Sequence, residues 1–365
     1  MEFGLSDEQR MLADSVRRWA DQSASPEQLK TLADAGHTHG QELLPGLAAL
    51  GTLGIMIDEH HGGSGMTLLD ACLVQQALGR NAVPTPWTAS AILAPLALAA
   101  ADASLASAWL PRLAAGEARL GVGLADAVGA RPDTGITLDA RDRASGVTRF
   151  VIDGPGADAW IVTAGRDTLL LVEADADGAE CVALPTIDRT RRVGELTLKG
   201  TPVVVLGRAG QAAPAIARLL AAGRTALAFD ALGAAERMLE RAVDYALERK
   251  QFGRVIGSFQ AVKHLCAEMA ADLEPCHSLL WYAAYADAAY PDEFELMACH
   301  AKAHMGDVGR QVARTATEVH GGMGFTHEMG LHYFFKRIGL DRQLLGNPDV
   351  VRQHAAALQG WSRAG

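Results

Sequence analysis

One stretch of this sequence decides how the rest is interpreted, and it reads Tyr245-Ala246-Leu247-Glu248-Arg249-Lys250-Gln251-Phe252-Gly253. It closes a run from Ala212 to Lys250 that is almost free of helix-breaking residues. At about 1.5 Å per residue, a helix over this run would be about 60 Å long. Its end would present the fixed guanidinium of Arg249 to an anion, and arginine suits bidentate pairing with a diphosphate. We therefore expect a long helix with an anion-binding end.

A second stretch belongs with the first, and it reads Glu318-Val319-His320-Gly321-Gly322-Met323-Gly324-Phe325-Thr326. Paired glycines let backbone amides approach a ligand more closely than a residue with a Cβ allows. Near the first stretch, Phe252 and Phe259 offer flat apolar contacts and Gln260 can form hydrogen bonds. An isolated Arg249 would more simply cap its helix and complement the helix dipole. Because all these residues occur together, we favour a ligand-binding function over a helix cap.

Both stretches resemble signatures of the acyl-CoA dehydrogenase family. Two further segments resemble this family in the same order along the chain, namely Leu50-Gly51-Thr52-Leu53-Gly54 running on to Gly65, and Asp188-Arg189-Thr190-Arg191-Arg192-Val193. The resemblance therefore covers most of the chain. It implies a mainly α fold with an N-terminal helical domain, a small antiparallel β-domain and a C-terminal four-helix bundle.

Local patterns divide the chain into three zones that agree with this expectation. Residues 1–119 read as helices, because Ser6 and Gln9 can form a capping box and further helices fit residues 44–53, 67–78, 89–101 and 103–115. A glycine-rich loop, Glu59-His60-His61-Gly62-Gly63-Ser64-Gly65, lies among them. Residues 120–208 contain short β-branched or apolar runs separated by Gly, Asp and Pro, which is typical of a β-domain.

Residues 209–365 form the third zone, and they read as long helices. We expect Ser258 to cap one helix and Pro291 to occupy the first turn of the next. A last helix fits residues 349–359. The helix after Ser258 carries an apolar stripe at helical spacing, made of Val262, Leu265, Cys266, Met269 and Leu273.

The resemblance also implies which residues bind a cofactor. In the family, the matching elements hold the pyrophosphate and adenosine half of the FAD of a neighbouring subunit. Carried over residue by residue, the expected FAD contacts are Arg249, Gln251, Phe252, Phe259, Gln260, Glu318, Gly321 and Gly322. Arg224 matches a position near the acyl-CoA pocket. Glu318 departs from the pattern, because the family usually has glutamine there and a carboxylate near phosphates is repelled unless it is paired or protonated.

The catalytic base of the family is missing from both positions where a glutamate would be expected. The reaction removes a proton alpha to a thioester, and a carboxylate must reach that carbon. Leu345 stands at the common base position and Gly223 at the alternative one, directly before Arg224. Asp230 and Asp349 are the remaining candidates, and a buried lone aspartate can have a raised pKa suited to a base. The competing interpretation of Asp230 is a structural residue bonded to a neighbouring side chain.

The β-domain also lacks family motifs for the flavin ring, so we expect a reduced domain with no catalytic residue of its own. The resemblance is then to the degenerate subunit of bacterial α2β2 heterotetramers that act on steroid side-chain CoA thioesters. It implies α,β-dehydrogenation of an acyl-CoA with FAD as cofactor, a homologous subunit as partner and electron-transfer flavoprotein as electron acceptor. Two alternatives remain open: a self-sufficient dehydrogenase with Asp230 as base, and a flavin-free structural or CoA-thioester-binding homo-oligomer.

Composition narrows the remaining classes of protein. The net charge of -10 argues against nucleic acid, whose binding needs clustered Lys and Arg. No run approaches the roughly 18 apolar residues of a membrane span, and no signal-peptide pattern is present. The cysteines show no metal-ligand spacing, so we expect no metal and reduced, buried thiols in a cytoplasmic protein.

Overall fold

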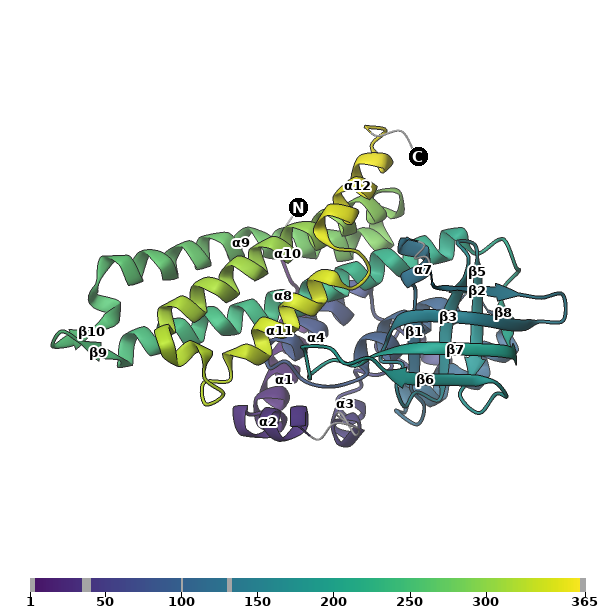
Figure 1. The fold of residues 1–365 in the computed structure, drawn as a ribbon, viewed down its shortest axis with the longest axis horizontal. Helices are drawn as coiled ribbons and strands as arrows, with labels where there is room; N and C mark the ends of the chain where they lie inside the picture. The colour runs from purple at the N-terminus through teal and green to yellow at the C-terminus, as the bar shows by residue number, and fades with distance from the viewer. Residues whose placement is uncertain (1–3, 35–40, 100, 130–132, 362–365) are drawn as a thin grey trace. The chain divides into compact units, whose positions relative to one another are not determined.

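The computed structural model describes residues 4–34, 41–99, 101–129 and 133–361. The chain divides into two compact units. The first, which we term the helical unit, comprises residues 1–35, 72–83 and 224–365. The second, termed the sheet unit, comprises residues 36–71 and 84–223. Long helices and one central sheet (Figure 1) confirm the expected mainly α fold with a β-domain.

In the helical unit, α10 packs against α9, α11 and α12, and Figure 1 shows these helices in green to yellow. The elements of this unit are α1 (Asp7–Ser23), α2 (Pro26–Asp34), most of α4 (Leu68–Arg80) and α8 (Ala213–Glu248), then β9 (Lys250–Gln251), β10 (Arg254–Val255), η4 (Ile256–Ser258), α9 (Gln260–Ala289), α10 (Pro291–His320), η5 (Gly321–Phe325), α11 (Leu331–Gln343) and α12 (Pro348–Leu358).

Most of the expected helix ends are confirmed. Ser6 and Gln9 form the capping box of α1, with side-chain bonds in both directions. Pro291 occupies the first turn of α10, where its missing N–H costs nothing. The expected cap at Ser258 is wrong: its hydroxyl donates to the Val255 carbonyl at 2.7 Å, and Phe259 precedes α9 without a side-chain cap. The Ser258 side chain therefore bonds within the 3₁₀ turn η4 and does not cap α9.

Two glycines set how α4 contacts α8 within the helical unit. A Cβ on Gly233 of α8 would lie 2.0 Å from the Gln76 carbonyl oxygen, and one on Gly79 would lie 2.2 Å from that of Asp230. Real Cβ atoms cannot approach an oxygen so closely, so each helix backbone rests on a glycine of the other. Helix propensity is lower at glycine, and close packing of the two backbones is what the glycines provide.

The sheet unit is built on one eight-stranded sheet with the order β6-β7-β3-β1-β4-β5-β8, and β2 pairs with β3. Most neighbouring strands are antiparallel, but β1 and β4 are parallel. The strands are β1 (Leu120–Gly123), β2 (Gly135–Leu138), β3 (Arg143–Ile152), β4 (Ala159–Ala164), β5 (Thr168–Glu173), β6 (Ala179–Ala183), β7 (Val193–Pro202) and β8 (Val204–Leu206). The family's motifs for the flavin ring are missing from the sequence of this unit, but the central strands of its sheet are formed.

The helical part of the sheet unit departs from the expected ranges. Helix α3 (Leu44–Ala49) ends before residue 53, because Gly51 takes a φ of +70°. The segment expected as one helix over 89–101 begins as a buried π-helix, Thr88–Leu93, and continues as α5 (Ala94–Leu98). Helix α6 (Ala103–Ala114) and the short α7 (Ala125–Val128) complete the unit, with 3₁₀ turns η1 (Gln41–Leu43) and η2 (Glu59–His61). None of the described helices is long and apolar enough to cross a membrane.

Candidate functional site

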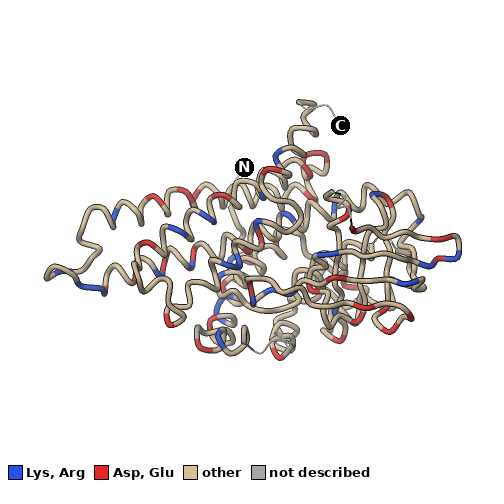
Figure 2. Tube along the Cα trace, in the orientation of Figure 1, with Lys and Arg blue, Asp and Glu red and all other residues tan. Residues whose placement is uncertain are grey.

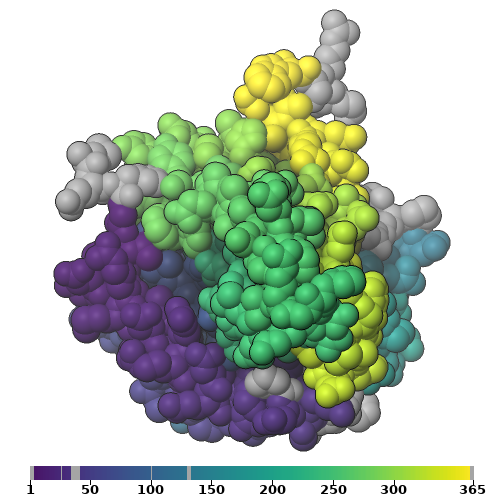
Figure 3. All heavy atoms as spheres, turned by 90° about the vertical axis from the view of Figure 1, so that its left-hand side faces the viewer, coloured from purple at the N-terminus to yellow at the C-terminus, as the bar shows by residue number. Residues whose placement is uncertain are grey.

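The stretch around residue 250 forms a two-stranded hairpin at one end of the helical unit. Gln251 pairs with Arg254, and the turn residues Phe252 and Gly253 have φ of +52° and +75°. Positive φ at both turn positions is the conformation that two-residue hairpins favour. Figure 3 views the molecule from this end, with the green atoms of this segment at the front. The Phe252 side chain is 93% exposed, so it is not part of the buried core.

Arg249 joins α8 to this hairpin. Its backbone N–H still donates to Tyr245 at 2.9 Å, and its carbonyl accepts from Ile256 at 2.8 Å. The side chain is exposed, and its guanidinium has no hydrogen bond or ion pair within the part of the chain that the structure describes. A helix cap would require bonds to the last carbonyls of α8. The contacts therefore do not support the cap interpretation.

Aromatic contacts order the start of α9 beside the hairpin. The Arg254 guanidinium lies over the Phe259 ring at 4.1 Å, and the Phe252 and Phe259 rings meet edge to face at 6.1 Å. Gln251 and Gln260 are both exposed. Basic residues gather on this hairpin, and Figure 2 shows them in blue at the end of the helical unit. The local charge therefore suits an anionic ligand.

The glycine stretch at the end of α10 is brought to the end of α8 by a ring stack. The Tyr245 and His320 rings are stacked, with their centroids 4.6 Å apart. His320 is buried, its Nδ1 is 2.7 Å from the Ala316 carbonyl, and burial lowers its pKa. Gly321 and Gly322 follow and are exposed, with no atom within 4 Å of a Cβ placed on either. The structure thus brings the two sequence stretches together, as the motif argument requires.

The backbone requires glycine at only one of these two positions. Gly321 has a φ of +60°, so the helix end alone favours glycine there. Gly322 has neither a positive φ nor a neighbour that would exclude a side chain. Glu318 lies one turn before them and is exposed. The open Gly322 and the exposed Arg249, which is unpaired among the described residues, leave room for a ligand or another chain.

The loop between α11 and α12 contains the expected base position. Leu345 is buried, and its φ of +57° is unusual for a residue with a Cβ. Arg224 is 2% exposed and donates from Nε to the Leu345 carbonyl at 3.0 Å. It also contacts His354 Nδ1 at 3.0 Å and Cys299 Sγ at 3.4 Å. The backbone at Leu345 is therefore strained and held in place by Arg224, although the leucine side chain cannot take a proton.

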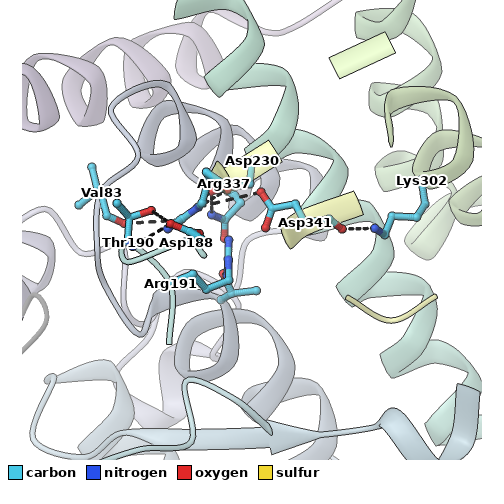
Figure 4. Close-up of polar contacts among 10 residues, drawn as sticks. Val83, Asp188, Thr190, Arg191, Asp230, Lys302, Arg337 and Asp341 are labelled. Carbon is cyan, nitrogen blue, oxygen red and sulfur yellow. Dashed lines mark hydrogen bonds and ion pairs between the residues drawn. The ribbon is translucent and has the colours of Figure 1, made fainter. Parts of the chain in front are cut away.

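Asp230 is held as a structural ion pair. It is fully buried, and its carboxylate accepts from Arg337 Nε at 2.6 Å and Nη2 at 3.1 Å. Gln75 donates to it at 2.5 Å. Figure 4 shows Arg337 beside Asp230, with Asp341 and Lys302 also in view. A carboxylate that accepts these bonds has its charged form stabilised, which is the opposite of what a general base with a raised pKa needs.

Asp349, the other candidate base, is not in a buried environment. It lies in the first turn of α12 with its side chain 82% exposed, 3.7 Å from Arg352. Neither remaining aspartate therefore has the surroundings of a general base.

Comparisons with known proteins agree with the sequence motifs. The family model for the acyl-CoA dehydrogenase N-terminal domain matches residues 6–117, and that for the C-terminal domain matches residues 213–358. Acyl-CoA dehydrogenase FadE34 of Mycobacterium tuberculosis is 32% identical over 98% of this chain, which spans about half of that relative (49%). Acyl-CoA dehydrogenase IpdE2 of the same organism is 31% identical, over 95% of this chain and 96% of its own.

Two solved structures are similar over nearly the whole chain. A variant of the Tcur3481-Tcur3483 steroid ACAD has a TM-score of 0.87 at 30% identity, and the match covers 97% of this chain and 98% of its own. The ChsE4-ChsE5 complex from Mycobacterium tuberculosis has a TM-score of 0.90 at 27% identity, and the match covers 100% of both chains. Motifs, fold and relatives lead to one conclusion: the chain belongs to the acyl-CoA dehydrogenase family.

Proposed function

We propose that this chain is the non-catalytic subunit of a flavin-dependent acyl-CoA dehydrogenase heterotetramer. In this assembly it contributes adenosine and pyrophosphate contacts to an FAD site in a homologous partner, and the partner supplies the base. The observation that carries the proposal is an asymmetry. The residues expected to serve a neighbour are present and, apart from the half-buried Phe259, exposed. Both base positions of this chain hold residues without a carboxylate, Leu345 and Gly223.

The hairpin end fits the anionic half of FAD. Arg249 and Gln251 are exposed donors, and Arg249 has no partner within the described residues. A diphosphate would pair with the guanidinium, and amide or backbone donors would bind its remaining oxygens. The open Gly322 would let the cofactor approach the end of α10. Phe252, Phe259, Gln260, Glu318 and Gly321 complete the proposed contacts.

The dehydrogenation needs a base at the substrate's alpha carbon and a hydride acceptor at its beta carbon, and bound FAD supplies the hydride acceptor. In this chain, Arg224 is already engaged by the Leu345 carbonyl and His354, so we assign it to holding the α11–α12 loop beside the proposed acyl-CoA site. The ion pair of Asp230 weighs against the self-sufficient alternative. A flavin-free homo-oligomer that binds CoA thioesters remains the second alternative.

The partner is proposed from both an exposed surface and the comparisons. Of the apolar stripe on α9, Met269 and Leu273 are buried, while Val262, Leu265 and Cys266 are only partly covered. A second chain could cover this stripe. The similar structures named for two chains, Tcur3481-Tcur3483 and ChsE4-ChsE5, suggest a homologous partner, and the first suggests a steroid thioester as substrate. Three further proposals are based on the resemblance alone. They are electron-transfer flavoprotein as electron acceptor, a cytoplasmic location, and a division into three domains (1–119, 120–208 and 209–365).

Flavin content tests the proposal. The chain should be purified alone and with a co-expressed homologous subunit, and both visible spectra and oligomer masses measured. A chain that is colourless alone and yellow only in the complex agrees with the proposal. A yellow chain that bleaches with an acyl-CoA contradicts it in favour of the self-sufficient enzyme. A colourless, stable homo-tetramer favours the flavin-free alternative.

Arg249→Ala tests the site assignment within that complex. Loss of charge-assisted hydrogen bonds costs about 1.5–3 kcal/mol, which corresponds to roughly 10- to 150-fold weaker FAD binding. Arg18→Ala is the matched control, because Arg18 is also exposed and, among the described residues, its side chain bonds only to Ser15 of its own helix. Equal FAD affinity in the two variants would remove Arg249 from the cofactor site.

A further inference from the structure

A hydrogen-bonded relay lies in the sheet unit and shares no residue with the proposed cofactor contacts. Asp58 Oδ1 is 2.9 Å from His61 Nδ1, and His61 Nε2 is 3.4 Å from Ser107 Oγ. His61 belongs to the glycine-rich loop, Asp58 directly precedes that loop, and Ser107 lies on α6. The three groups stand in the order acid, imidazole, hydroxyl that nucleophilic serines use on unrelated folds.

The loop fixes the imidazole. Asp58 caps η2 by accepting the His61 backbone N–H at 2.9 Å, and this bond lowers the pKa of Asp58. The same carboxylate oxygen faces Nδ1, and an ionised carboxylate can only accept, so Nδ1 carries the hydrogen. In the neutral ring, Nε2 then presents its lone pair to the Ser107 hydroxyl. The His61 side chain is only 16% exposed, which limits rotation out of this position.

From this geometry we propose that Ser107 is an activated nucleophile that accepts acyl groups from activated esters and thioesters. Ser107 is exposed, so an acyl carbonyl can reach Oγ. The proposal does not depend on the flavin-related function, because none of its residues takes part in that site.

The reaction uses the relay in two balanced steps. Oγ bonds to the acyl carbon while its proton passes to His61 Nε2. The C–S or C–O bond of the donor then breaks, and the leaving thiolate or alkoxide takes that proton. Water, deprotonated by the same nitrogen, can later attack the acyl-serine; the acyl C–Oγ bond then breaks, Oγ takes the proton back from Nε2, and a carboxylic acid is released. Asp58 keeps the ring in the required tautomer and stabilises the imidazolium.

The surroundings limit which acyl donors can react. The backbone N–H groups of the adjacent loop are already bonded, from Gly62 to Glu59, Gly63 to Asp58, Ser64 to Gly54 and Gly65 to Ile57. These four donors are therefore not available to stabilise an oxyanion, a contribution worth about 10²–10³ in rate where it is present. We expect acylation by donors with good leaving groups and slow release of the acyl-serine.

p-Nitrophenyl acetate is the probe, with acetylated serines located by peptide mass spectrometry at pH 8. Ser104 is the matched control, since it is exposed one turn earlier on α6 and has no histidine partner in the described residues. General-base catalysis contributes about 10²–10⁴-fold, so Ser107 should be acetylated at least ~100-fold faster than Ser104. His61→Gln should lower the Ser107 rate to that of Ser104, and Asp58→Asn should lower it in part.

Ser107→Ala removes only an exposed hydroxyl, so it checks that the released nitrophenol comes from this site in a folded protein. If Ser107→Ala no longer releases nitrophenol rapidly, and its melting temperature is unchanged, the proposal is supported. Equal acetylation of Ser104 and Ser107, or a Ser107 rate that His61→Gln leaves unchanged, overturns it.

Discussion

Replacing Asp230 by asparagine removes one charge from the buried ion pair without opening a cavity. Asp230 is fully buried and Arg337 is 1% exposed, so solvent cannot replace the lost partner of the guanidinium. Breaking a buried pair from one side costs about 3–5 kcal/mol. Asp341 lies 4.0 Å from Arg337 Nε and offsets part of the loss. We therefore expect Asp230→Asn to lower the free energy of unfolding by about 3 kcal/mol.

Urea unfolding followed by far-ultraviolet circular dichroism measures this loss, with the slope m compared between variants to confirm the same unfolding transition. For a unit of 150–250 residues, a loss of about 3 kcal/mol lowers the melting temperature by roughly 6–12 °C. Asp349→Asn is the control: its side chain is exposed, and it should change stability by less than about 0.5 kcal/mol.

A double variant separates the pair from the site it occupies. Asp230→Leu with Arg337→Met replaces both charges by apolar groups, and such replacements are often neutral or stabilising. The double variant should therefore be more stable than Asp230→Leu alone. A loss below about 1 kcal/mol for Asp230→Asn would refute the structural assignment and reopen Asp230 as a base.

Two further predictions concern contacts of α8. Gly233→Ala places a Cβ 2.0 Å from the Gln76 carbonyl, so we expect destabilisation by about 1–3 kcal/mol in urea unfolding, although alanine favours helix; unchanged or increased stability would contradict the close packing. His277 Nε2 lies 3.1 Å from Glu236, and this hydrogen bond raises the pKa of His277 against burial. The stabilisation from this pair is therefore fully present below the unfolded pKa of about 6.5, and it is lost as pH rises through the raised folded pKa of His277. His277→Gln lacks this contribution. Between pH 6 and pH 9 its melting temperature should therefore fall less than that of the parent.

The sequence alone determined the family, the order of the elements and the two stretches that form the hairpin end. Signals of this kind are local. Each signal affects the structure only within a few residues. Examples are the capping box at Ser6, the proline at the start of α10, and the Arg-Lys-Gln-Phe-Gly and Gly-Gly runs. The same locality explains the errors, because Ser258 has the right residue type for a cap but bonds to the Val255 carbonyl instead.

Only the tertiary structure decided the status of the buried charges. Asp230 and Arg337 are 107 positions apart, and no sequence period links them, so the spacing in α8 could not separate a lone base from a structural pair. The same holds for Arg224, whose guanidinium the fold directs to the Leu345 carbonyl, and for the relay from Asp58 to Ser107. Hydrogen-bond partners across such separations are set by how helices and loops pack. A buried polar group without a hydrogen bond is costly, and its partner can come from any part of the chain that packs against it.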